Sequence, residues 1–177
     1  MPERRMWNGT GMESRGRWAI LLLAIGLCAA VGNARGEVQR AGADGFFITL
    51  SAPVAATPAR AWSGIVQVQH WWSDEHTWSG KAANLSLKAE AGGCFCEHWK
   101  DGSVEHGRVI MALKDRLLRL DAALGPLQEL ALDGILSFQI VGDDAGVIRL
   151  EIDYRVNGAS GSGLDSYAPQ VDAVLGA

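Results

Sequence analysis

Apolar and polar positions alternate between Asp44 and Ala56. Phe46, Ile48 and Leu50 fall on one side of this alternation, which breaks at Pro53. A period of two is typical of a half-buried strand, so the pattern predicts a first strand here.

The spacing then changes to that of a helix. Thr57-Pro58 resembles a helix N-cap followed by proline at the first helical position, and 59–66 supplies a short amphipathic stretch. A second short helix or turn is expected around His70-Trp71-Trp72, before a polar loop at 73–80.

Period two returns in the second half of the chain, interrupted by turn signals such as Gly92-Gly93 and Asp101-Gly102. About six consecutive antiparallel strands are predicted, at 85–89, 94–99, 104–113, 117–121, 134–141 and 147–156. A last helix is expected near Asp165 or Ser166. Its apolar stripe consists of Tyr167, Val171, Val174 and Leu175.

This order of elements predicts an α+β fold: a curved antiparallel sheet of seven strands, two short helices and a C-terminal helix. Such a sheet cannot bury its concave face on itself, so the last helix is expected to lie across it. The space between a curved sheet and its helix is commonly a ligand pocket.

The segment before this domain is typical of an export signal. Four arginines at positions 4, 5, 15 and 17 precede an uncharged, mostly apolar stretch at 18–31. As a helix this stretch would be only about 21 Å long, shorter than the roughly 30 Å hydrocarbon core of a bilayer. We therefore expect residues 1–36 to be a signal peptide, cleaved after Ala34 or Gly36, and residues 37–177 to form one exported domain, periplasmic or secreted, with no stable membrane span.

Charge excludes one class of partner. The whole chain has 16 basic and 20 acidic residues, of which five and two precede Glu37, so the remainder carries 11 and 18 and a net charge of −7. Because it is acidic and has no basic cluster, the domain is a poor candidate for nucleic-acid binding.

Several segments resemble the SRPBCC superfamily, and within it the polyketide cyclase and heat-shock ATPase activator homologue branch. They are HWWSDEHTWSG at 70–80, LSLKAEAGGCFCEHW at 85–99, GSVEHGRVIMAL at 102–113, LRLDAALGPLQ at 118–128 and VDAVLG at 171–176. The resemblance implies a START-like helix-grip fold around an internal cavity. In that fold the closing helix extends further than this chain does, so we expect a truncated helix.

The resemblance implies a hydrophobic ligand more readily than a reaction, because the superfamily includes carriers, receptors, cyclases and co-chaperones. Export would separate the domain from cytosolic chaperones, which argues against ATPase activation. We therefore expect a non-catalytic protein that binds a small apolar or aromatic molecule. A cyclase- or hydratase-like enzyme and a protein-binding envelope factor are the alternatives, the latter with an unknown partner.

One candidate site is the polar and aromatic cluster in 70–78. His76 could act as an acid or base near Trp71, Trp72 and Trp78, which are expected to contact the ligand. The alternative is a solvated loop held by its tryptophans. Phe138 is expected in the cavity wall.

A second candidate lies on the two arms of the Asp101-Gly102 hairpin, where Glu97, His98, Glu105 and His106 could form a Glu–His pair that polarises a bound carbonyl. A surface ion pair is the alternative.

Cys94, Cys96 and His98 share one face of their strand, so all three face the cavity if either cysteine does. They would then be ligand-contacting residues, with His98 and His106 as catalytic candidates. The cysteines are expected to be two unpaired side chains in a pocket wall; a strained disulfide and a metal site are the alternatives.

No Ser/His/Asp order, phosphate-binding glycine loop or dinucleotide fingerprint occurs in the sequence. We therefore expect neither a cofactor nor a resident metal.

Overall fold

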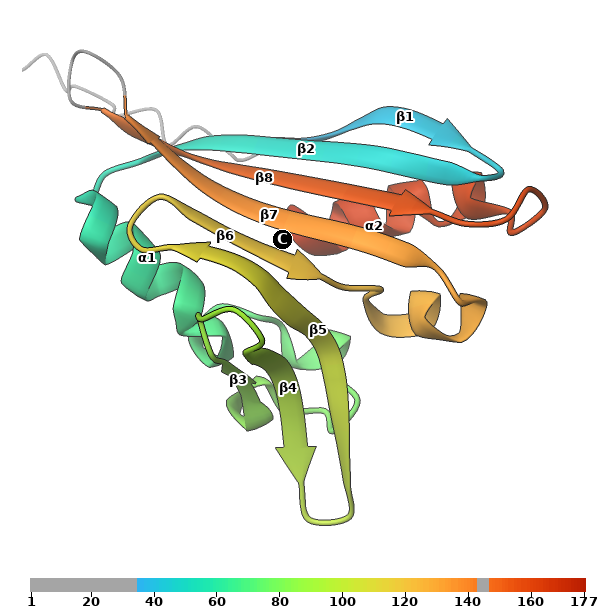
Figure 1. Cartoon of the computed structure of the whole chain (residues 1–177), viewed down its shortest axis with the longest axis horizontal. Helices are drawn as coiled ribbons and strands as arrows, with labels where there is room; N and C mark the ends of the chain where they lie inside the picture. The colour runs from blue at the N-terminus through green and yellow to red at the C-terminus, as the bar shows by residue number, and fades with distance from the viewer. Residues whose placement is uncertain (1–34, 143–146) are drawn as a thin grey trace, which may run out of the picture. The chain divides into compact units, whose positions relative to one another are not determined.

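The computed structural model describes residues 35–142 and 147–177. Eight antiparallel strands form a single open sheet in the order β1-β2-β8-β7-β6-β5-β4-β3 (Figure 1). The strands are β1 Arg35–Gly42, β2 Gly45–Val54, β3 Leu85–Leu87, β4 Cys94–Trp99, β5 Gly102–Leu113, β6 Leu117–Asp121, β7 Asp133–Gly142 and β8 Ile148–Asn157. The α+β class with an antiparallel sheet and a C-terminal helix is thus confirmed.

The strand number differs from the predicted seven, because β1 was not expected. Its sequence hardly alternates: Val38 is its only large apolar residue, and a bulge between Val38 and Arg40 interrupts its pairing with β2. An edge strand with few buried side chains gives little period-two signal.

The expected export segment lies outside the described residues, except for Arg35 and Gly36. These two residues begin β1 and pair with Ser51 and Leu50 of β2. Cleavage after Ala34 would leave β1 whole, whereas cleavage after Gly36 would remove its first two residues.

The first predicted strand corresponds to β2. Phe46, Ile48 and Leu50 are buried in the core, while Phe47 on the other face lies beneath the guanidinium of Arg155. The strand continues through Pro53, still paired with β8. Because β1 pairs with β2 only as far as Ser51, β2 is an edge strand at Pro53, where a proline is tolerated.

Helix α1 Pro58–Val66 begins as predicted, with the Thr57 hydroxyl accepting a hydrogen bond from the Arg60 backbone N–H. Three short 3-10 helices follow: η1 Val68–His70, η2 Asp74–His76 and η3 Ala82–Asn84. Together they carry the chain from the middle of the sheet to β3 at its far edge (Figure 1).

The C-terminal helix α2 Ala168–Leu175 follows the 3-10 turn η5 Leu164–Ser166 and packs against β1 and β2. Another 3-10 helix, η4 Gly125–Leu130, connects β6 to β7. The main core lies on the face of the sheet that these elements cover, with Leu118, Leu136 and Tyr154 among its fully buried side chains.

Candidate functional site

A pocket of about 560 Å³ lies between three segments: residues 72–78, η4 and α2. Most of the side chains around it are apolar, among them Trp72, Trp78, Leu124, Leu127, Val171 and Val174. Polar side chains join them from Glu75, His76, Thr77, His106 and Gln170. A concave, mainly apolar space with few polar groups is the usual form of a small-molecule site.

The first wall of the pocket is not a freely solvated loop. Trp72 donates its indole N–H to the backbone oxygen of His76 at 2.9 Å, and its ring packs edge-on against Phe95. The carboxylate of Asp74 accepts a hydrogen bond of 2.6 Å from the Ala82 backbone N–H. These contacts fix the backbone that presents Trp72, His76 and Trp78.

The second wall, formed by Leu124 and η4, is tied to the sheet by Tyr154, whose side chain is completely buried. The Tyr154 hydroxyl donates to the Ala122 backbone oxygen at 3.0 Å and accepts from the Leu124 N–H at 3.1 Å. Burial raises the pKa of Tyr154 far above its ordinary value, so the phenol stays protonated and can donate. Gln128 of η4 adds a hydrogen bond to the Glu105 backbone oxygen.

His106 enters the pocket because β5 contains a bulge. Phe95 pairs with Gly107 and Cys96 with Glu105, so His106 has no partner of its own on β4. A bulge redirects a side chain relative to simple alternation, and here both His106 and Gly107 are buried. Gly107 lets the chain pass close to Ala122, since a Cβ there would lie 2.7 Å from the Ala122 Cβ.

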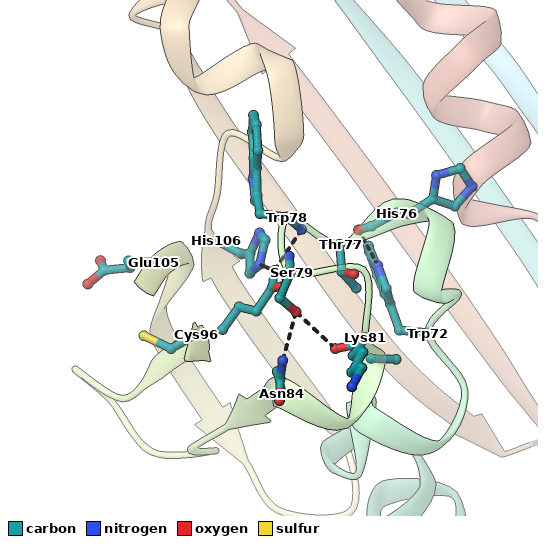
Figure 2. Close-up of polar contacts among 12 residues, drawn as sticks. Trp72, His76, Thr77, Trp78, Ser79, Lys81, Asn84, Cys96, Glu105 and His106 are labelled. Atoms are coloured by element: carbon teal, nitrogen blue, oxygen red, sulfur yellow. Dashed lines mark hydrogen bonds and ion pairs between the residues drawn. The ribbon is translucent and has the colours of Figure 1, made fainter. Parts of the chain in front are cut away.

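His106 meets Glu97 inside the protein. Its Nε2 lies 3.0 Å from Oε2 of Glu97, with the two side chains 6% and 0% exposed. The His106 ring also stacks at a tilt on Phe95, with the ring centroids 5.0 Å apart. Figure 2 shows His106 beside Trp78 and Ser79.

Glu97 is an anion held by backbone donors. The N–H groups of Trp78 and Ser79 donate to its two oxygens at 3.1 and 2.5 Å. Burial acts to raise the pKa of Glu97, but the hydrogen bonds from Ser79, Trp78 and His106 outweigh it and hold the pKa below its ordinary value. One carboxylate thus fixes both the Trp78 segment and the His106 ring.

The opposite face of the same hairpin carries the two cysteines. Cys94 and Cys96 form a disulfide with their Cα atoms 5.4 Å apart, so the expectation of two unpaired cysteines in a pocket wall is wrong. Residues two apart on a strand can be bridged here because the Cα separation is well below the roughly 6.6 Å of a fully extended strand.

The side chains of β4 alternate between two faces as predicted. The face that carries Cys94, Cys96 and His98 points outward, and the opposite face points inward. Phe95 and Glu97 are buried, whereas His98 is exposed on the same face as the cysteines. Figure 2 shows Cys96 and Glu105 pointing away from His106. The sulfur atoms lie within 4.8 Å of a Glu105 oxygen, but a disulfide lacks the thiolates that bind metals, and Glu105 pairs with Arg108.

The structure therefore divides the predicted site residues into three groups. Trp72, Trp78, His76 and His106 line the pocket. Trp71 and Phe138 pack against each other, 6.4 Å between ring centroids, and neither is among the residues that line it. Cys94, Cys96 and His98 lie on the far side of β4.

No pattern along the chain placed η4 at the pocket, although the C-terminal helix was expected to cover the sheet. Leu124, Gly125, Pro126 and Leu127 line the pocket through a turn that resembled an ordinary loop. The apolar stripe of the C-terminal helix, by contrast, was visible in the sequence, and all four of its residues line the pocket.

Among the described residues, no helix is both long enough and apolar enough to cross a membrane.

No family model matches the sequence, and no curated protein matches it significantly. Solved structures do match its fold. A conserved protein of unknown function from Enterococcus faecalis has a TM-score of 0.51 at 9% identity, over 81% of this chain and 72% of its own. An uncharacterized protein from Rhizobium leguminosarum also has a TM-score of 0.51, at 13% identity, over 81% of this chain and 91% of its own. At such identities the likeness establishes a shared fold alone.

Proposed function

We propose that this protein binds a small apolar or aromatic molecule in the pocket between residues 72–78, η4 and α2. The observation that carries the proposal is the lining, which is mainly apolar and rests on hydrogen-bonded walls. Burying a ligand against Trp72, Trp78, Leu127 and Val171 would supply roughly 25 cal/mol for each Å² of apolar surface removed from water.

We further propose that the chain is a member of the SRPBCC superfamily and that it is exported. The first is supported by the motifs at 70–80, 85–99 and 102–113 and by the order of strands and helices, and the second by the signal-like pattern of 1–36. An exported carrier would meet apolar compounds outside the cytoplasm.

Ligand binding is tested with N-phenylnaphthylamine, a neutral apolar probe whose fluorescence rises when it leaves water. We expect saturable binding to the wild-type protein and about tenfold weaker binding to Val174→Asn, because the amide would occupy an apolar wall. Val141→Asn is the matched control, since Val141 is 41% exposed and does not line the pocket. Absence of saturable binding to the wild type would refute the proposal.

Mass spectrometry of protein purified without denaturation offers an independent check. We expect an apolar small molecule to be recovered from the wild type and to be depleted in Val174→Asn but not in Val141→Asn. Equal recovery from both variants would place the molecule outside this pocket.

The second candidate function is a cyclase- or hydratase-like reaction. The Glu97–His106 pair favours it, because a carboxylate-bound imidazole beside an apolar pocket is a common form of general base. Of the three histidines considered, His106 is the one that combines burial with access to the pocket. His106→Gln should abolish turnover of any substrate that the wild type converts, and full activity in that variant would exclude this role.

A further inference from the structure

The pairing of His106 leaves one ring nitrogen for a ligand. Nε2 lies 3.0 Å from the Glu97 carboxylate, and one face of the ring lies against Phe95. Among the described residues Nδ1 has no hydrogen-bond partner, and the only fully buried side-chain nitrogen or oxygen atoms left unpaired there belong to Asp115 and Asp172. Nδ1 is therefore neither satisfied by the protein nor sealed inside it.

Glu97 decides which nitrogen carries the proton. Its Oε2 already accepts from the Trp78 N–H, its Oε1 accepts from the Ser79 N–H, and an ionised carboxylate has only acceptors. The His106 nitrogen that faces it must therefore be the donor. In the neutral ring this leaves Nδ1 as an acceptor with a lone pair.

We propose that the ligand of this pocket carries a weakly acidic hydroxyl group, a phenol or an enol, and that this hydroxyl donates a hydrogen bond to Nδ1 of His106. The inference rests on the proposed binding function and names the chemistry of its ligand. The apolar lining would hold the ring or chain of the molecule, and His106 would fix the end that bears oxygen. A carbonyl or ether offers no proton and would leave Nδ1 unsatisfied.

The contact between the ligand hydroxyl and Nδ1 can form with the proton on either atom. If the hydroxyl proton stays on oxygen, the contact is O–H···Nδ1. If it transfers, the O–H bond breaks, an Nδ1–H bond forms, and the resulting oxyanion faces an imidazolium whose other side contacts Glu97. No other atom moves and no oxidant or co-reactant is needed.

The other titratable groups near His106 are more exposed to solvent than Glu97 is. Glu75 and His76 line the pocket from η2 and are exposed, and Tyr167 lines it from the start of α2. On β5 itself, Glu105 points to the other face and pairs with Arg108. Glu97 of β4 is thus the charged group in direct contact with the ring.

The probes for this proposal are para-hexylphenol and its methyl ether, which share the ring, the chain and the oxygen atom. Displacement of bound N-phenylnaphthylamine gives the affinity of each. We expect the wild type to bind the phenol about tenfold more tightly than the ether, the effect of about one hydrogen bond. Equal affinities would overturn the proposal while leaving the binding function intact.

His106→Gln separates the role of Nδ1 from that of the Glu97 contact. A glutamine amide can still donate to Glu97 from the position of Nε2, but its one acceptor, the carbonyl oxygen, is not held by a ring at the position of Nδ1. We expect the ratio of the phenol and ether affinities, measured in the same variant, to fall from about tenfold to near one. His98→Gln, on the exposed face of the same hairpin, should keep the full preference. A preference retained by His106→Gln would overturn the assignment of the hydroxyl to Nδ1.

Nitrogen NMR of the full chain tests the proposal without any probe. At mildly alkaline pH we expect His106 to carry its proton on Nε2 and to have a bare Nδ1, whose chemical shift moves when para-hexylphenol is added but not when the ether is added. A proton on Nδ1 with Nε2 bare would contradict the proposed acceptor. Failure of N-phenylnaphthylamine to bind would instead refute the binding function itself.

Discussion

The two faces of the β4–β5 hairpin use similar residues in opposite ways. On the inner face Glu97 and His106 are buried together, and the carboxylate also holds two backbone N–H groups. On the outer face one guanidinium nitrogen of Arg108 donates to both carboxylate oxygens of Glu105, and the two side chains are 56% and 45% exposed, beside the Cys94–Cys96 disulfide. Burial, more than residue type, therefore decides which polar pair contributes to stability, since a paired group in water loses little when its partner is removed.

The largest effect is expected from Glu97→Ala. The change leaves His106 and the N–H groups of Trp78 and Ser79 without their acceptor inside the protein, so we expect the free energy of unfolding to fall by about 3 to 5 kcal/mol. Urea denaturation measures it.

Glu105→Ala is the matched control on the outer face, with an expected loss below about 1 kcal/mol because its ion pair is exposed. If Glu97→Ala does not fold, Glu97→Gln is used in its place. We expect its loss of stability to be smaller than that of Glu97→Ala but larger than that of Glu105→Gln. Equal losses of stability from the Glu97 and Glu105 variants would refute the claim that burial makes the inner pair the more important one.

Gly107→Ala tests whether the inner face depends on the bulge. The new methyl group would meet the Ala122 side chain and the Asp121 backbone oxygen, so we expect a loss of about 2 kcal/mol from overpacking. Gly142→Ala is the control, because among the described residues no atom outside its chain neighbours lies within 4 Å of a Cβ at that position. Thermal unfolding of both variants is the measurement, and a Gly107→Ala protein as stable as Gly142→Ala would contradict the packing argument.

The disulfide is expected to contribute less. It closes a loop of only three residues, for which the chain-entropy relation gives about 1.5 kcal/mol. We expect the Cys94→Ser/Cys96→Ser double variant to lose about that much stability in urea. The preference for para-hexylphenol over its ether should be unchanged, because the sulfurs lie on the face away from the pocket. Loss of that preference would show that the two faces are coupled through the bulge.

The smallest expected effect on stability appears only at acidic pH. Because the pKa of Glu97 is lower in the folded protein, its ionised form stabilises the fold fully above the ordinary glutamate pKa of about 4.3, and this contribution is lost as the pH falls through the lower, folded value. Stability measured from mildly acidic pH downward should therefore fall more steeply for the wild type than for Glu97→Gln. Glu105→Gln should follow the wild type, and a parallel course of all three proteins would rule out this contribution from Glu97.

Local patterns in the sequence were enough to predict most elements. The alternation of Phe46, Ile48 and Leu50 identified β2, Thr57-Pro58 marked the start of α1, and Asp101-Gly102 marked the β4–β5 turn. These features follow from side-chain periodicity and turn chemistry, which act over a few residues. Strand β1 escaped prediction because it buries little and depends on β2 for its hydrogen bonds.

The sequence by itself also placed Cys94, Cys96 and His98 on one face of β4 and Phe95 and Glu97 on the other, since alternation along a strand is fixed by its geometry. Which of these two faces turns inward depends on the segments packed against the sheet, and these come from distant parts of the chain. The bulge that brings His106 to Glu97 is likewise a property of two strands in register. The pocket needs η4 and α2 as well, so its walls come from parts of the chain that no local pattern connects.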